Sequence, residues 1–216
     1  MIRGASERVF VDGPVGKIEV VIDHPAGFAD EGAIESACGI ALVAHPHPLF
    51  GGTADNKIAQ TLARTFAELG YVSLRPSFRG VGKTEGKHDH GEGETDDLVR
   101  LIDWGRSRYG ELPVVLAGFS FGAFVQSRVA KRVTPERMVL VGMPHGLVTG
   151  GRTYRSEAVP ADSIVIHGEL DETAPLANVL EWARPQELPI VLVPGADHFF
   201  HRRLHLIKSI VKRQWR

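Results

Sequence analysis

The chain has 216 residues, of which 43% are hydrophobic and 24% charged, as in ordinary soluble globular proteins. This length suits one α/β domain spanning residues 1–216, with a substantial core. A net charge of −1 provides no overall basic field to neutralise phosphates, so nucleic acid is not expected as a partner.

The sequence favours a cytoplasmic protein. Cys38 is the only cysteine, so no internal disulfide can form, which fits a reducing compartment. Residues 1–8 lack the apolar core of a signal peptide. No apolar run approaches the length of a membrane span, so no membrane partner is expected. The oligomeric state stays open, a homodimer included.

The first half of the chain alternates between short strands and helices. Residues 9–22 predict two strands broken by Asp12-Gly13-Pro14, an antiparallel hairpin at a sheet edge. Residues 40–44 and 71–74 predict further strands, and residues 95–109 a helix with Asp96 and Asp97 in its first turn. Between these strands, residues 56–69 predict a helix whose apolar face and terminating glycine are Ile58, Leu62, Phe66, Leu69 and Gly70.

The second half continues the alternation. Residues 114–117, 138–141, 164–166 and 190–193 are short apolar runs, and the last three are of the type buried on both faces of a parallel sheet. A helix is expected over residues 123–133, and a C-terminal helix that packs on the sheet through Leu204, Ile207, Ile210 and Val211. The pattern predicts a mostly parallel, doubly wound sheet with helices on both faces.

The segment Gly118-Phe119-Ser120-Phe121-Gly122 follows a strand and precedes a helix. This is the G-x-S-x-G nucleophile elbow in the context it requires. The turn is strained, and the flanking glycines allow neighbouring backbone to approach closely. Because a serine alone is a poor nucleophile, Ser120 needs a base and an orienting acid further along the chain.

Candidates for both follow predicted strands in the chain order of α/β-hydrolases. Asp171 lies just beyond the run at residues 164–166, and His198 just beyond the run at 190–193. In this scheme His198 takes the proton of Ser120 and Asp171 holds the imidazole tautomer. Three other carboxylates compete for the acid's role. Glu169 is too close to its strand, Asp197 adjoins the histidine it would face, and Glu172 is a near rival.

Acyl transfer also needs hydrogen-bond donors aimed at the developing oxyanion. One expected donor is the backbone N–H of Phe121, the residue after the nucleophile. The other should come from the loop that follows residues 40–44. Since Pro46 and Pro48 have no N–H, the simplest donor there is the main chain of His47.

Three segments carry a family resemblance: residues 45–57 with their His-Pro-His-Pro loop, residues 77–86, and the elbow at residues 117–123. They resemble small bacterial α/β-hydrolases without a large cap, usually described as predicted serine esterases. The chain is also similar, more distantly, to dienelactone hydrolases, which have a cysteine where this chain has Ser120. The resemblance covers most of the chain from residue 40 onward. It implies the α/β-hydrolase fold and serine-hydrolase chemistry, but no substrate.

Two other motifs could suggest different chemistry, but each is incomplete. Residues 80–84, Gly-Val-Gly-Lys-Thr, lack the first glycine of a phosphate-binding P-loop, whose position is Ser77. The pair His45 and His47, and the run His88-Asp89-His90, fall short of a metal site because no third ligand spacing completes one. We therefore expect no metal and no cofactor, and interpret residues 88–90 as a solvated surface loop.

The connection over residues 142–162 is too short to form a large cap and is expected to be a loop or one short helix. An open cleft that accepts small esters is therefore expected. Its walls are expected to include Leu49, Phe50, Phe119, Met143, His145 and Phe199.

The sequence thus favours a serine hydrolase that cleaves small carboxylic esters through a covalent acyl-enzyme. A thioesterase or a small-peptide hydrolase is an alternative, because the same three residues can act on all these carbonyls. A non-catalytic scaffold that binds a small ligand is an alternative from another class. It is disfavoured, because a scaffold has no reason to retain Ser120, Asp171 and His198 together.

Overall fold

The structure, a computed structural model, describes residues 6–26 and 37–215. Residues 1–5, part of the N-terminal segment considered for a signal peptide, lie outside this range. Eight strands form one sheet in the order β1-β2-β4-β3-β5-β6-β9-β10. These strands are β1 (Ser6–Gly13), β2 (Gly16–Asp23), β3 (Gly39–Ala44), β4 (Tyr71–Pro76), β5 (Val114–Phe119), β6 (Arg137–Val141), β9 (Ile164–Gly168) and β10 (Ile190–Val193).

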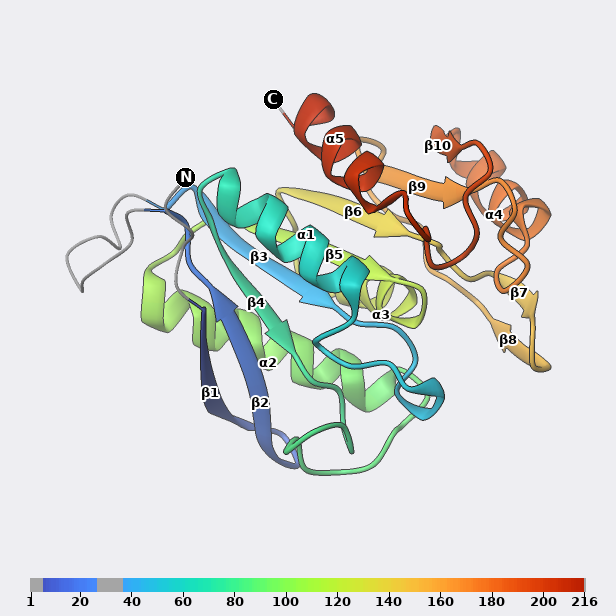
Figure 1. The fold of residues 1–216 in the computed structure, drawn as a ribbon. Helices are drawn as coiled ribbons and strands as arrows, with labels where there is room; N and C mark the ends of the chain where they lie inside the picture. Colours follow the sequence, from blue (N-terminus) through green and yellow to red (C-terminus); the bar gives the residue numbers. More distant parts are fainter. Residues whose placement is uncertain (1–5, 27–36, 216) are drawn as a thin grey trace.

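The strands from β4 to β10 run parallel, whereas β1 and β2 form an antiparallel hairpin and β2 pairs antiparallel with β4. The expected hairpin at a sheet edge is thus confirmed. Helices cover both faces, as the alternating pattern predicts (Figure 1). They are α1 (Lys57–Glu68), α2 (Glu92–Tyr109), α3 (Phe121–Val129), α4 (Leu176–Ala183) and α5 (Leu204–Gln214), with short 3-10 turns η2 (Pro48–Phe50) and η3 (Arg184–Gln186).

The two faces of the sheet contribute to separate apolar cores. On one face, α1 and α5 bury residues such as Ile58, Phe66 and Ile207 against the sheet. On the other, α2, α3 and α4 do the same with Leu101, Val125 and other apolar side chains. Burial of these apolar faces is the main favourable term that holds the helices on the sheet. The architecture is the α/β-hydrolase fold expected from the sequence.

Two helices begin earlier than expected. α2 starts at Glu92 rather than residue 95, because Glu94 accepts the N–H of Gly91 and Asp89 accepts that of Gly93. Asp96 and Asp97 therefore lie beyond its first turn, where Glu92 and Glu94 stand. The elbow helix α3 starts directly after Ser120 and ends at Val129, four residues before the expected end.

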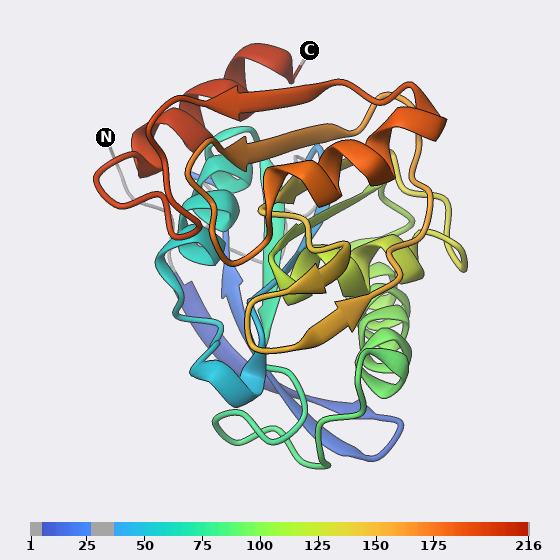
Figure 2. The same cartoon turned by 90° about the vertical axis from the view of Figure 1, so that its right-hand side faces the viewer.

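Two further expectations are corrected at the far end of the sheet. The strand β10 is not buried on both faces. It is the edge strand and its Leu192 is 42% exposed. The connection after β6 is neither a loop nor a short helix but a two-stranded antiparallel hairpin, β7 (Gly146–Val148) and β8 (Arg152–Tyr154). This hairpin lies beyond the carboxyl end of the sheet, next to the segment that carries η2 (Figure 2).

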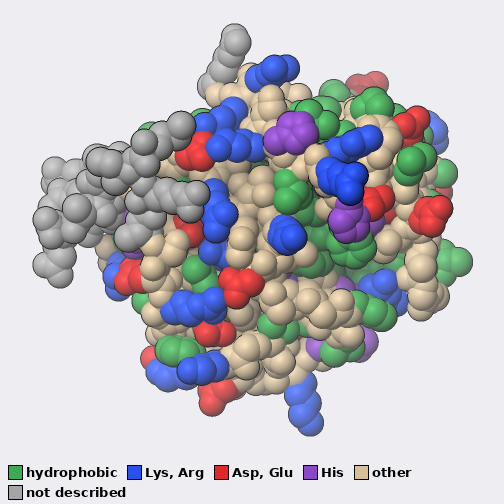
Figure 3. All heavy atoms as spheres, in the orientation of Figure 1, with side chains coloured by type: hydrophobic (Ala, Val, Ile, Leu, Met, Phe, Trp, Pro, Cys, Tyr) green, Lys and Arg blue, Asp and Glu red, His purple; other side chains and the backbone are tan. Residues whose placement is uncertain are grey.

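The surface carries charges of both signs. On the face drawn in Figure 3, lysine and arginine side chains are intermingled with aspartate and glutamate. Within the described residues, no helix is long and apolar enough to cross a membrane.

Close approach of α3 to the sheet depends on two glycines. A Cβ at Gly122 would come within 2.3 Å of the carbonyl oxygen of Ala44, and one at Gly118 within 2.6 Å of the backbone of Gly122. Gln126 reinforces the contact, since its side-chain amide donates to the carbonyls of Leu42 at 2.8 Å and Ala117 at 3.0 Å. The start of α3 is thereby fixed against the ends of β3 and β5.

Gly122→Ala should lower the free energy of unfolding by about 1–3 kcal/mol, because the added carbon meets backbone that cannot turn aside. Gly105→Ala is the matched control, since its carbon would meet only side-chain methyl groups of Ile40 and Leu74 at 3.3 Å. Denaturant unfolding of both variants provides the measurement. A Gly122→Ala protein as stable as wild type would contradict the close approach.

Candidate active site

Ser120 alone forms the turn between β5 and α3. Its φ of 54° and ψ of −123° lie where side chains other than glycine are rarely found. The backbone is held on both sides of the residue: its N–H donates to the carbonyl of Val141 at 2.9 Å, and its carbonyl accepts from Ala123 at 2.8 Å. The strained turn expected from the sequence is thus present, and it leaves the side chain half-buried at the carboxyl end of the sheet.

The structure brings Ser120, His198 and Asp171 together. The Nε2 atom of His198 lies 3.0 Å from Ser120 Oγ, and its Nδ1 lies 2.7 Å from Asp171 Oδ2. Both His198 and Asp171 are buried. With Nδ1–H donating to the carboxylate, Nε2 is the nitrogen left to accept the hydroxyl proton.

Asp171 is itself held by its surroundings. Its Oδ1 accepts the N–H groups of Thr173 at 3.0 Å and Ala174 at 2.7 Å. The buried ring of His167 lies beside it, with Nε2 donating to the carbonyl of Ala174 at 2.9 Å and 3.5 Å from Asp171 Oδ2. Burial lowers the pKa of His167, although Asp171 opposes the effect. This histidine was missed in the sequence because it lies inside the strand β9.

The competing carboxylates are engaged elsewhere or exposed to solvent. Glu169 accepts the N–H of Gly195 at 2.7 Å. Asp197 pairs with His201. Glu172 is exposed to solvent. Asp171 is therefore the carboxylate that contacts His198.

The two backbone N–H groups expected to bind an oxyanion are available. Phe121 is the first residue of α3, where a helix leaves its N–H groups unpaired. In the η2 loop, the carbonyl of His47 accepts from Phe50 and Gly52, and its ring Nδ1 accepts from Leu49. The N–H of His47 has no acceptor among the described residues. The rings of His47 and Phe121 lie 4.8 Å apart, so the two residues are neighbours.

His45 ties this loop to the loop after β4. Its buried ring donates from Nδ1 to the carbonyl of Pro46 at 2.6 Å and accepts at Nε2 from the N–H of Phe78 at 2.9 Å. Both ring nitrogens are therefore used in a neutral imidazole. Burial lowers the pKa of His45 to about 4. Its role is to hold the loop, and neither nitrogen is free to bind a metal ion.

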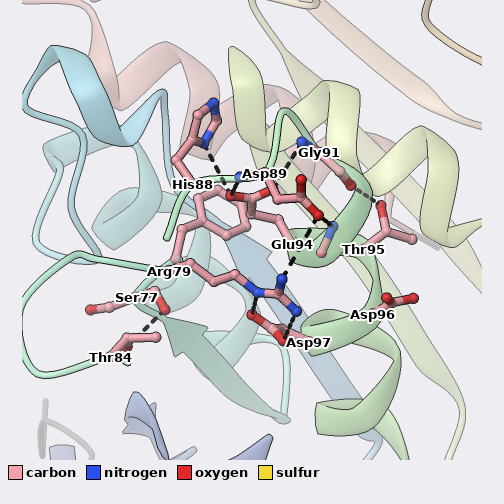
Figure 4. Close-up of polar contacts among 12 residues, drawn as sticks. Ser77, Arg79, Thr84, His88, Asp89, Gly91, Glu94, Thr95, Asp96 and Asp97 are labelled. Atoms are coloured by element: carbon pink, nitrogen blue, oxygen red, sulfur yellow. Dashed lines mark hydrogen bonds and ion pairs between the residues drawn. The ribbon is translucent and has the colours of Figure 1, made fainter. Parts of the chain in front are cut away.

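The run at residues 88–90 is not simply a solvated loop, as the sequence suggested. The His88 side chain is 6% exposed and donates from Nδ1 to the fully buried carboxylate of Glu94 at 3.0 Å (Figure 4). Glu94 also accepts the N–H groups of Asp89 and Gly91. The ring of His88 packs 4.8 Å from that of His47 and 5.3 Å from that of Phe121. The loop therefore forms a wall behind the two backbone donors.

A buried ion pair anchors the same loop to α2. Arg79 donates to Asp97 from Nε at 2.8 Å and from Nη2 at 2.9 Å, and both side chains are buried (Figure 4). Separating the two side chains would leave a buried charge without a partner, so the pair opposes movement of the loop away from α2. Neither this pair nor the Glu94 cluster was predicted. The one available signal was the glutamate three residues after Gly91, a common position for a carboxylate at a helix start.

The expected walls of the cleft divide into two groups. Leu49, Phe50 and Phe199 are exposed at this end of the sheet, and His145 is partly exposed. Phe119 and Met143 are fully buried and present no surface to a ligand, which corrects their expected role. The reason is that each side chain belongs to one of the apolar cores of the sheet. Phe119 instead supports the ring of His198, 4.8 Å away.

No group of three or more His, Cys, Asp or Glu side chains that could hold a metal ion occurs within residues 6–26 and 37–215.

Similarity to known proteins agrees with this geometry. The family model for X-Pro dipeptidyl-peptidases (S15 family) matches residues 38–160, more than half of the chain. A serine hydrolase without a lid from Xanthomonas campestris has a TM-score of 0.84 and 32% identity, covering 99% of this chain and 95% of that one. The chain belongs to the α/β serine hydrolases, within the family that this model describes. A serine hydrolase homologue from Coxiella burnetii, with a TM-score of 0.83 and 34% identity, covers 97% of each chain.

This α/β serine hydrolase also resembles lysophosphatidylserine lipase ABHD12 of Macaca fascicularis, with 24% identity over 172 residues. That match covers 79% of the present chain but only 35% of the lipase. The resemblance to small α/β-hydrolases without a cap is confirmed, since the Xanthomonas campestris hydrolase has no lid. The distant similarity to dienelactone hydrolases stays a prediction.

The lowered pKa of His45 predicts a loss of stability in mild acid. The unfolded chain takes up this proton near pH 6.5 and the folded chain only near 4, so stability falls as pH drops through this window. A difference of this size corresponds to roughly 3 kcal/mol. The free energy of unfolding, measured by chemical denaturation between pH 7 and 4, should fall less steeply with decreasing pH for His45→Gln than for wild type. An equally steep fall in both proteins would show that His45 does not contribute to the pH dependence.

Proposed function

We propose that this hydrolase cleaves small carboxylic esters through a covalent acyl-enzyme on Ser120. The observation that carries the proposal is the continuous pair of hydrogen bonds from Asp171 to His198 at 2.7 Å and from His198 to Ser120 at 3.0 Å. A serine needs such a base to become a useful nucleophile at neutral pH.

In the proposed reaction, Ser120 Oγ attacks the ester carbonyl carbon while His198 Nε2 accepts the hydroxyl proton. Asp171 stabilises the imidazolium that forms. The tetrahedral intermediate collapses as the carbon–oxygen bond to the alcohol breaks, and His198 returns the proton to the leaving alkoxide. Water then attacks the acyl-enzyme with the same proton transfers, which releases the carboxylic acid and restores Ser120.

The charge on the carbonyl oxygen would be stabilised by the backbone N–H groups of Phe121 and His47. Support for this comes from their lack of other acceptors and from the position of Phe121 at a helix N-terminus, where the partial charge is positive. One well-placed donor of this kind is worth roughly 2.7–4 kcal/mol. Removing a backbone donor by mutation is difficult, so the side chains provide the better test.

The preference for small esters rests on the short connection after β6. The hairpin β7–β8 has three residues in each strand, too little to roof a long apolar tunnel. The exposed Leu49, Phe50 and Phe199 offer little burial to a long acyl chain. An open site is consistent with the lidless serine hydrolase from Xanthomonas campestris.

A peptidase is the second candidate, because the matching family model describes X-Pro dipeptidyl-peptidases. The same three residues can act on an amide, but a peptidase must also bind the peptide on both sides of the scissile bond. Turnover of Ala-Pro-p-nitroanilide with a higher kcat/KM than p-nitrophenyl acetate would favour this alternative.

A cytoplasmic location and the absence of cofactors are also part of the proposal.

Ser120→Ala should reduce turnover of p-nitrophenyl acetate by about 10⁶-fold, because the nucleophile acts as one unit with its base and acid. Thermal unfolding should change little, because the substitution removes a single half-buried oxygen atom and its hydrogen bond to His198. Steady-state assays of purified protein provide the measurement. Retention of more than a few per cent of wild-type turnover by a folded variant would show that Ser120 is not the nucleophile.

A further inference from the structure

Arg152 lies at the start of β8, in the hairpin beyond the carboxyl end of the sheet (Figure 2). Its guanidinium carbon sits 4.2 Å from the centre of the Phe50 ring. The Phe50 ring in turn lies 4.9 Å from that of His47. An arginine of the hairpin is therefore stacked on the loop that carries one of the proposed oxyanion donors.

No carboxylate of the described residues forms an ion pair with Arg152. Its Nη1 donates to the hydroxyl of Tyr154 at 3.2 Å and its Nη2 to the carbonyl of Thr149 at 3.0 Å. Its Nε is buried without a partner. A guanidinium has five N–H donors, so most of this donor capacity is unused. Arg79, by contrast, is matched by Asp97.

Arg152 is also close to the reacting end of the site. The ring of Phe121, the residue after Ser120, lies 4.8 Å from His47 and 6.4 Å from Tyr154. Arg152 contacts Phe50 and Tyr154, so the ring of Tyr154 links it to Phe121.

Arg152 brings a positive charge to the surroundings of His47. Burial lowers the pKa of His47 to about 4, and the positive charge of Arg152 adds to this effect. An electropositive, partly buried site of this kind favours an anion over a neutral group.

We propose that Arg152 forms a subsite for an anionic group of the substrate, a carboxylate or a phosphate carried a few bonds from the scissile ester. This inference rests on the proposed ester hydrolysis at Ser120. The planar guanidinium fork suits the paired oxygens of either anion, and its stacking on Phe50 holds the fork in place. A purely structural arginine that only joins Phe50 to Tyr154 is the alternative outcome of the test.

The test compares matched pairs of esters that differ in one charge. In the first arm, the p-nitrophenyl monoesters of glutaric and adipic acid carry a carboxylate on the acyl side. They are compared with the neutral p-nitrophenyl pentanoate and hexanoate. In the second arm, the acetate ester of 2-hydroxyethyl phosphate carries a phosphate on the alcohol side. It is compared with the neutral monoacetate of ethylene glycol. The ratio of kcat/KM between the anionic and neutral members is measured for each pair.

Arg152→Gln should lower this ratio by roughly ten- to hundredfold in one arm, as expected for a lost charge-assisted hydrogen bond. The arm that responds identifies the anion and its side of the ester. Arg152→Lys should recover part of the loss, because it keeps the charge but not the fork. Arg155→Gln is the matched control: it removes the same charge from an exposed residue nearby and should leave the ratio unchanged.

Unchanged ratios in both arms for folded Arg152→Gln protein that still hydrolyses the neutral esters would overturn the subsite alone. An equal fall in the ratio for Arg155→Gln would show that only general surface charge matters. If wild type hydrolysed none of these esters, the proposed function itself would fail, and the subsite with it. Thermal unfolding of each variant separates these outcomes from a loss of folding.

Discussion

The close approach of α3 to the ends of β3 and β5 is the constraint on which the rest of the site depends. It requires that residues 118 and 122 have no side chain, because a Cβ at either would collide with backbone. Ser120 between them is held at a positive φ that its own side chain disfavours. The energy for this strain comes from the buried surface of α3 and from hydrogen bonds such as those of Gln126. The result is a hydroxyl in a fixed position at the sheet end.

The loops around this hydroxyl are held by buried polar groups rather than by apolar packing alone. His45 links the loop after β3 to the loop after β4, and Glu94 organises the chain around His88. Polar groups at such depth are costly unless each has a partner, so these bonds restrict the loops to few arrangements. A rigid loop would suit the proposed role of His47, because an oxyanion donor stabilises the transition state only where its position is set in advance.

The sequence predicted those features that depend on neighbouring residues. The elbow at Ser120 is specified by glycines two residues away on either side, and the strands before Asp171 and His198 are short apolar runs. Their meeting at one sheet edge follows from the parallel topology. The presence of each strand was predicted more accurately than the residues at which the elements begin and end. The start of α2 is an example. It depends on side chains of Asp89 and Glu94 that fold back onto the backbone.

Contacts between distant residues were not accessible in this way. His88 lies 41 positions after His47, and Arg152 lies 102 positions after Phe50. No local pattern links either pair. Burial of Phe119 and Met143 likewise depends on which of the two apolar cores each side chain enters. The hairpin β7–β8 was missed because strands of three residues are too short to produce a pattern.

The proposed role of Ser120 as the activated nucleophile is tested most directly by covalent labelling. Wild-type protein is treated with a fluorophosphonate, digested and examined by mass spectrometry, with His198→Ala as a parallel sample. One phosphonyl group is expected on the peptide that contains Ser120, and labelling should be lost in the His198 variant, since the base is needed to activate the serine. Labelling at another residue, or equal labelling without His198, would contradict this role of Ser120.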